Sequence, residues 1–149
     1  MPRERIYLDT SVINVYRDPR DVFLQQQTRL FWANIGTYEP YVSVVVLGEI
    51  EAASSTIQQE LRELVEGFPV LYLTPEAEQL AEHYINEGIF ARRDQNDARH
   101  VAVATTGEMD YLVSWNFRHL VRVKTRRMVN EINLQVGYKT VEIVAPSEL

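Results

Sequence analysis

Four acid or amide side chains, scattered over most of the chain, have types that could do chemistry together: Asp9, Glu49, Asp97 and Asn116. Asp9 and Asn116 each come just after a short apolar run. Residues just past parallel strands converge at one edge of an α/β sheet. Carboxylates brought together there repel each other unless a cation neutralises them. The pattern therefore predicts a hard divalent metal and a metal-assisted hydrolysis.

Glu49 is expected on a helix face that turns toward the core. Val45 and Val46 precede it by four and three residues, and Ala52 and Ala53 follow it at the same spacings. A buried glutamate is rare unless it is paired or bound to a metal. A functional role for Glu49 is therefore favoured over a solvated one.

Asp97 is expected in the first turn of a helix that Asp94 begins. It shares a face with Val101 and Ala104, so its carboxylate should point inward, where the helix amides stabilise the ionised form. The alternative is an acid that only complements the helix dipole. Asp94 is read first as a cap and second as a supporting residue of the site. His100 is expected to be a packed or hydrogen-bonded residue rather than a ligand.

Asn116 can offer its amide oxygen to a metal or to a bound water, without charge. Asp110 precedes the same predicted strand and should lie roughly 15 Å from its other end, so we interpret it as structural. The hydroxyls of Thr10, Ser11 and Ser114 are neutral donors that could hold a phosphate or a water.

The net charge of −6 argues against a protein that coats nucleic acid through electrostatics. One basic stretch stands apart, because positions 118–127 hold five cationic residues and no acid. The stretch is either a solvated helix-terminal face or a strip that contacts phosphates, and Arg118 is the candidate for substrate binding.

A chain of 149 residues with average composition predicts a single domain over 1–149. The sequence has no cysteine, which excludes disulfides, thiolate metal sites and cysteine nucleophiles. No signal-like or membrane-length apolar segment is present, so we expect a cytoplasmic protein without a membrane partner.

Short apolar runs alternate with helical patterns, which predicts an α/β fold with a short-stranded, mainly parallel central sheet covered on both faces. The predicted strands are Arg5–Leu8, Pro40–Ser43, Val70–Leu73, Tyr111–Ser114 and Val141–Val144, the last at an edge; the predicted helices begin near Ser11, Asp21, Ser43, Ser55, Pro75, Asp94 and Lys124.

Local signals suggest where several helices begin. Ser43 and Thr74 have the residue types of helix caps. Ser55 and Gln58 match a capping box. The run 42–47 is ambiguous, because its β-branched residues could also extend the preceding strand.

Four stretches carry a resemblance to the PIN-domain family, which includes VapC-type toxins of toxin–antitoxin pairs. The matching stretches are Leu8–Ile13, Val46–Ile50, Asn96–Ala104 and Asp110–Phe117. They occur in the expected order over nearly the whole chain. No single one is specific, but together they resemble the family pattern.

The resemblance implies a three-layer α/β/α PIN-like fold, dependence on Mg²⁺ or Mn²⁺ and cleavage of single-stranded RNA. It implies metal-ligand roles for Asp9, Glu49 and Asp97. An antitoxin protein and a homodimer are also implied. The family often has a fourth acid where this chain has Asn116, so a second metal is expected to bind more weakly.

Two alternatives remain. The pair Asp9 and Thr10 also resembles aspartyl-phosphate phosphatases, which need a second acid where Ser11 stands. The chain could instead be a catalytically weak or inactive PIN-like module that binds RNA or a protein partner.

Overall fold

The computed structural model describes residues 2–149, and five short strands in this part of the chain form a single sheet. The order across the sheet is β3-β2-β1-β4-β5, and every neighbouring pair is parallel. The predicted α/β class and parallel sheet are confirmed, including the last strand at an edge. The strands are β1 (Arg5–Leu8), β2 (Glu39–Ser43), β3 (Val70–Leu71), β4 (Tyr111–Val113) and β5 (Glu142–Val144).

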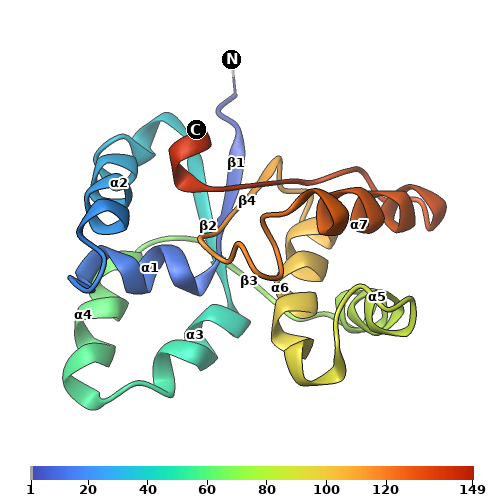
Figure 1. Ribbon diagram of the computed structural model, residues 1–149, viewed down its shortest axis with the longest axis horizontal. Coiled ribbons are helices and arrows are strands. Elements are labelled where there is room, and N and C mark those ends of the chain that lie inside the picture. The colour runs from blue at the N-terminus through green and yellow to red at the C-terminus, as the bar shows by residue number, and fades with distance from the viewer. Residues whose placement is uncertain (1) are drawn as a thin grey trace.

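Helices cover both sides of this sheet and make three layers (Figure 1). The helices α1, α2 and α4 lie on one side of the strands, and α5, α6 and α7 lie on the other. The helices are α1 (Thr10–Arg17), α2 (Val22–Ala33), α3 (Val44–Glu51), α4 (Ser55–Val65), α5 (Pro75–Asn86), α6 (Gln95–Thr106) and α7 (Val123–Gln135), with short 3-10 turns η1 (Ile35–Thr37), η2 (Arg92–Asp94) and η3 (Pro146–Glu148).

The central strands are buried on both faces. Ile6, Tyr7 and Leu8 of β1 are fully buried, as are Leu112 and Val113 of β4. A parallel sheet with helices on both sides requires nearly continuous apolar strands, which explains why these runs do not alternate between apolar and polar residues. No helix within residues 2–149 is both long and apolar enough to span a membrane.

Two of the predicted caps are confirmed. Ser43 Oγ accepts the backbone N–H of Val45 and Val46, and Thr74 Oγ1 accepts that of Ala77. The cap at Ser43 also resolves the ambiguous run, because β2 ends there and α3 begins at the next residue.

One other cap prediction is wrong, and a second is confirmed only in its position. The helix near Ser55 exists, but Gln58 bonds to the carbonyls of Glu51 and Ala53 and forms no capping box. Asp94 stands at the cap position of α6, yet its side chain makes no cap hydrogen bond. Its carboxylate is turned toward other groups, described below.

The pairing of β1 with β4 decides which residues meet at the carboxyl ends and at the amino ends of the strands. Leu8 pairs with Val113, and the Asp9 amide donates to the Val113 carbonyl at 3.1 Å, so Asp9 and Ser114 leave the sheet together. At the amino ends of the same strands, Asp110 Oδ2 accepts the backbone N–H of Arg5 at 2.8 Å. This bond confirms the structural interpretation of Asp110.

Candidate functional site

Asp9, at the end of β1, is held by hydroxyl groups from two segments. Its Oδ2 accepts hydrogen bonds from Ser11 Oγ at 2.8 Å and from Ser114 Oγ. Ser11 Oγ also accepts the backbone N–H of Trp115 at 2.9 Å, which ties α1 to the loop after β4. Asp9 is 5% exposed. Its second oxygen, Oδ1, lies 3.6 Å from Nε2 of His100.

Glu49, on α3, reaches the same place from the other side. Its Oε1 accepts a hydrogen bond from Thr10 Oγ1 at 2.8 Å and lies 2.5 Å from His100 Nε2. Burial opposes ionisation of Glu49, but the hydrogen bonds from His100 and Thr10 outweigh it and lower the pKa of this carboxyl. Glu49 is therefore poised as a carboxylate.

Asp97, in the first turn of α6, is joined to the loop after β4 through Asn116. Asn116 Nδ2 donates to Asp97 Oδ1 at 3.3 Å, and Asn116 Oδ1 accepts the backbone N–H of His119 at 2.9 Å. Burial, together with the nearby charge of Asp9, raises the pKa of Asp97 to about 6. The cluster therefore disfavours a further negative charge at this position.

Asp94 and His119 extend the cluster beyond Asp97. One ligand atom of each of Asp94, Asp97 and His119 lies within 4.8 Å of the others. His119 Nε2 is 4.0 Å from Asp94 Oδ2, which is too far for a hydrogen bond. Ligand atoms held about 2.1 Å from one ion are separated by roughly 3–4 Å, so a shared cation would draw these three side chains slightly closer together.

The four predicted positions lie at the carboxyl ends of the strands as two pairs: His100 lies between Asp9 and Glu49, and Asn116 contacts Asp97. The pairs are connected by Ser114, which donates to Asp9 and accepts the backbone N–H of Asn116. Among the described residues, the only set of three acid or histidine side chains with ligand atoms within 4.8 Å of one another is Asp94, Asp97 and His119, so Asp9, Glu49 and Asp97 do not form such a set. Within residues 2–149, no lysine or arginine forms an ion pair with Asp9, Glu49 or Asp97. Thr10, Ser11 and Ser114 hold the carboxylates, as described above. Arg118 is exposed on the loop that follows Asn116.

Two histidines contact the acids of the site in ways that the sequence did not predict. His100 was expected to be hydrogen-bonded, and it is, but its contact with Glu49 joins residues 51 positions apart and left no local signal. His119 had a signal, because it stands three residues after Asn116, but it was seen only as part of the basic stretch.

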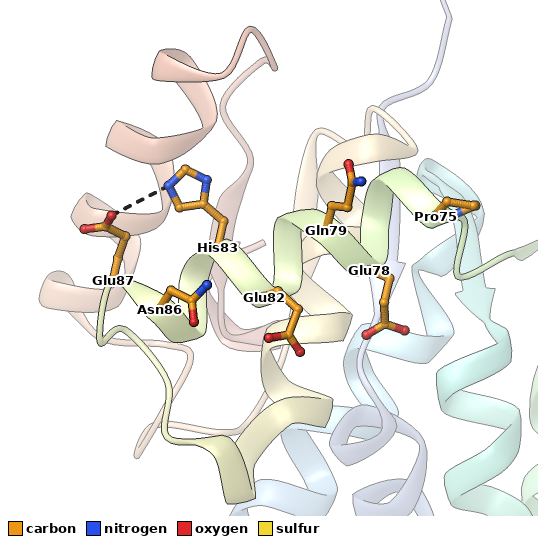
Figure 2. Close-up of a pocket in the computed structure, with 7 residues that line it drawn as sticks. All are labelled: Pro75, Glu78, Gln79, Glu82, His83, Asn86 and Glu87. Carbon is orange, nitrogen blue, oxygen red and sulfur yellow. Dashed lines mark ion pairs between the residues drawn. The ribbon is translucent and has the colours of Figure 1, made fainter.

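A second polar region lies along α5, where a surface hollow is lined by residues of that helix and by Glu87, which follows it (Figure 2). It includes none of the predicted site residues. Two of its acids are paired with arginines: Glu78 with Arg99 at 3.0 Å, and Glu82 with Arg92. Its residues are Pro75, Glu78, Gln79, Glu82, His83, Asn86 and Glu87.

Comparison with solved structures identifies the fold of this chain, whereas comparison of the sequence finds no match. No family model matches the sequence, and no curated protein matches it either. Among solved structures, VapC20 of Mycobacterium tuberculosis, described as a sarcin-ricin loop cleaving toxin, is similar over 92% of this chain and 98% of that one, with 15% identity and a TM-score of 0.61. The chain has the fold of VapC toxins.

Two further structures support this result. VapBC2 of Rickettsia felis, solved with a DNA fragment from its promoter, is similar over 95% of this chain and 98% of that one, at 12% identity and a TM-score of 0.56. VapBC-5 of M. tuberculosis, from the VapBC family of toxin–antitoxin systems, has the same coverage, 19% identity and a TM-score of 0.51. The PIN-like three-layer fold implied by the sequence resemblance is confirmed, and identities this low show the fold alone.

Proposed function

We propose that this chain is a divalent-metal-dependent endoribonuclease that cuts single-stranded RNA, as the toxin of a toxin–antitoxin pair. One observation carries the proposal. Carboxylates from β1, α3 and α6 gather at one edge of a VapC-like sheet, and no lysine or arginine of the described chain pairs with Asp9, Glu49 or Asp97.

The side chains present fit a hard cation. Within residues 2–149, Asp9 Oδ1, Glu49 Oε2 and Asp97 Oδ2 accept no hydrogen bond, so each acid keeps one oxygen for a metal. Carboxylate oxygens are the ligands that Mg²⁺ and Mn²⁺ prefer. The raised pKa of Asp97 fits the same conclusion, because burial and the charge of Asp9 cause it and a bound cation would offset both.

A bound Mg²⁺ or Mn²⁺ would supply an activated water and neutralise charge on the phosphate. The chain's own groups orient the ligands: Ser11 and Ser114 hold Asp9, and Thr10 holds Glu49. Asn116 donates to Asp97 and so aligns it without adding charge. Arg118, exposed on the next loop, is the proposed contact to the RNA backbone.

The proposal extends to partners and location. An antitoxin segment that brings an arginine or lysine into the carboxylate cluster would neutralise it as a metal does and so inhibit the enzyme. A homodimer and a cytoplasmic location complete the proposal.

A second candidate is a PIN-like module that binds RNA or a protein without cutting. The observation that favours it is Asn116, which stands where the family often has an acid and whose amide is engaged on both sides. Such a module would keep the fold and the cluster but would show no metal-dependent turnover.

The deciding experiment is cleavage of a labelled single-stranded RNA with Mn²⁺, with Mg²⁺ and with a chelator. Asp9→Asn should lower the rate by roughly 10³-fold, because a metal centre contributes several kcal/mol to the transition state. Asp110→Asn, an aspartate at the opposite edge of the sheet, should cut normally. Metal-independent cutting, or equal cutting by both variants, would overturn the nuclease proposal, and no cutting at all would favour the binding module.

A further inference from the structure

A chain of buried polar groups lies behind Glu49 and has no part in the function proposed above. Tyr7 and His100 are almost completely buried, with 0% and 1% of their surface exposed. The Tyr7 hydroxyl lies 2.6 Å from Ser43 Oγ and 2.6 Å from His100 Nδ1. The other ring nitrogen, Nε2, is 2.5 Å from Glu49 Oε1. The four side chains form one hydrogen-bonded chain from the core to the carboxylates.

The helix cap at Ser43 sets the direction of this chain. Ser43 Oγ already accepts two backbone N–H groups from the first turn of α3, at 3.1 and 3.3 Å. A hydroxyl has two acceptor lone pairs and one hydrogen, so the Ser43 hydrogen is left to donate to the Tyr7 oxygen. Tyr7 then donates its own hydrogen to His100 Nδ1. A ring that accepts at Nδ1 carries its hydrogen on Nε2, which faces Glu49.

The geometry points to Tyr7 and His100 as positioning residues for Glu49: they hold an N–H group against Oε1 and so leave Oε2 to bind the metal. This inference rests on the proposed role of Glu49 as a metal ligand. Thr10 donates to the same Oε1, so two hydrogen bonds hold this oxygen. Groups that hydrogen-bond to a metal ligand change metal affinity by about 10- to 100-fold when they are removed.

The inference is tested on the full chain by titrating Mn²⁺ in a calorimeter. Tyr7→Phe keeps the ring and removes only the hydroxyl. Tyr84→Phe is the matched control, because Tyr84 is equally buried and its hydroxyl donates to Asn133, outside the carboxylate cluster. Both variants lose a buried hydrogen bond and should unfold at lower temperature. Only Tyr7→Phe should raise the Mn²⁺ dissociation constant, by about tenfold.

Substitutions of the ring separate a donor from simple packing. His100→Gln retains an N–H group that can face Glu49, whereas His100→Leu fills similar space without one. We expect the dissociation constant to rise more in His100→Leu than in His100→Gln. If Tyr7→Phe and Tyr84→Phe lose stability alike and both bind Mn²⁺ as the wild type does, the positioning role is overturned.

Two further measurements separate this inference from the proposed function. Nitrogen NMR of the His100 ring, recorded without metal, should find hydrogen on Nε2. A ring without hydrogen on Nε2 would overturn the inference, whatever the result of the Mn²⁺ titration. Glu49→Gln should weaken Mn²⁺ binding. Unchanged binding in Glu49→Gln would remove the metal centre itself, whereas weakened binding there with unchanged binding in Tyr7→Phe would remove only the positioning role.

Discussion

The acids on α5 and the acids at the sheet edge are neutralised in different ways. On α5, Glu78 and Glu82 each pair with an arginine, Arg99 and Arg92 (Figure 2 shows the two acids). Around Asp9, the carboxylates meet hydroxyls, one amide and one histidine. Arginines of the chain thus neutralise Glu78 and Glu82, whereas no lysine or arginine within residues 2–149 pairs with Asp9, Glu49 or Asp97.

The two regions are connected through the start of α6. Arg93, the cation nearest to Asp94 in the sequence, lies 3.9 Å from its carboxylate, whereas Arg92 and Arg99, which flank Asp94 and Asp97, pair elsewhere. Their pairing with α5 directs both guanidinium groups away from the cluster while it anchors α6.

The largest expected effect comes from removing the negative charge of Asp97. Asp97→Asn should weaken Mn²⁺ binding by roughly 100-fold or more. This exceeds the loss expected when a group that only hydrogen-bonds to a metal ligand is removed. Without metal the substitution should raise the melting temperature by roughly 2–4 °C, because the cost of burying the carboxylate and its repulsion by Asp9 are both removed. The gain corresponds to about 1 kcal/mol, less than the pKa shift alone implies, since solvent screens a part-exposed group.

The α5 acids provide the control for this comparison. Glu82→Gln breaks a pair between exposed side chains and should leave both the melting temperature and the Mn²⁺ affinity close to wild type. Calorimetric titration and thermal unfolding of the two variants check both results. A lower melting temperature in metal-free Asp97→Asn would contradict the view that this carboxylate is held against repulsion.

The pH dependence of metal binding should follow Asp97. Its pKa is raised from 3.8 to about 6, so metal must displace a proton below that pH. The rise in melting temperature that Mg²⁺ produces should therefore shrink as pH falls from 7.5 to 5.

The folding stability of the metal-free protein should also depend on pH through Asp97. The raised pKa means that Asp97 favours folding when protonated, and this contribution is lost as pH rises from about 4 to 6. The stabilisation of Asp97→Asn over wild type should grow over that window. A constant difference between pH 4 and 7 would show that Asp97 does not titrate as described.

A smaller effect is expected at His119, where Asp94 and Asp97 complete a possible set of ligands. His119→Ala should weaken Co²⁺ binding by about tenfold, or 1.4 kcal/mol, and leave Mg²⁺ binding nearly unchanged, because an imidazole nitrogen suits Co²⁺ better. His83→Ala is the matched control, since His83 also lies beside a carboxylate, Glu87, at 3.8 Å. Equal Co²⁺ affinity in the two variants would show that His119 is not a ligand.

Much of the fold could be predicted because its signals are local. The apolar run before Asp9 and the caps at Ser43 and Thr74 each act within a few residues, so one sequence is enough to read them. The order of the strands was not predictable, because pairings such as Leu8 with Val113 depend on contacts across 105 positions. The capping box at Ser55 failed for a related reason: Gln58 found better acceptors in the preceding turn.

Candidate site residues could be proposed from the sequence where a strand or helix end marks the position, as at Asp9 and Asp97, and their roles stay a prediction. The supporting groups could not be proposed in this way, because Tyr7 and His100 look in the sequence like ordinary core residues. A tyrosine in an apolar strand and a histidine on a helix become informative only when a hydrogen-bonded chain between them is seen. Sequence patterns locate the charges, and packing decides what orients them.

The smallest expected effect concerns the exposed arginine beside the cluster. In an Asp9→Asn background, which should not cut RNA, Arg118→Ala should weaken binding of a single-stranded RNA several-fold and reduce the salt dependence by about one phosphate contact. Arg62→Ala removes an exposed arginine from α4 and should change neither quantity. Fluorescence anisotropy over a range of salt concentrations measures both. An equal loss in the two variants would mean that RNA responds to overall charge, and the loop after β4 would then have no special place in binding.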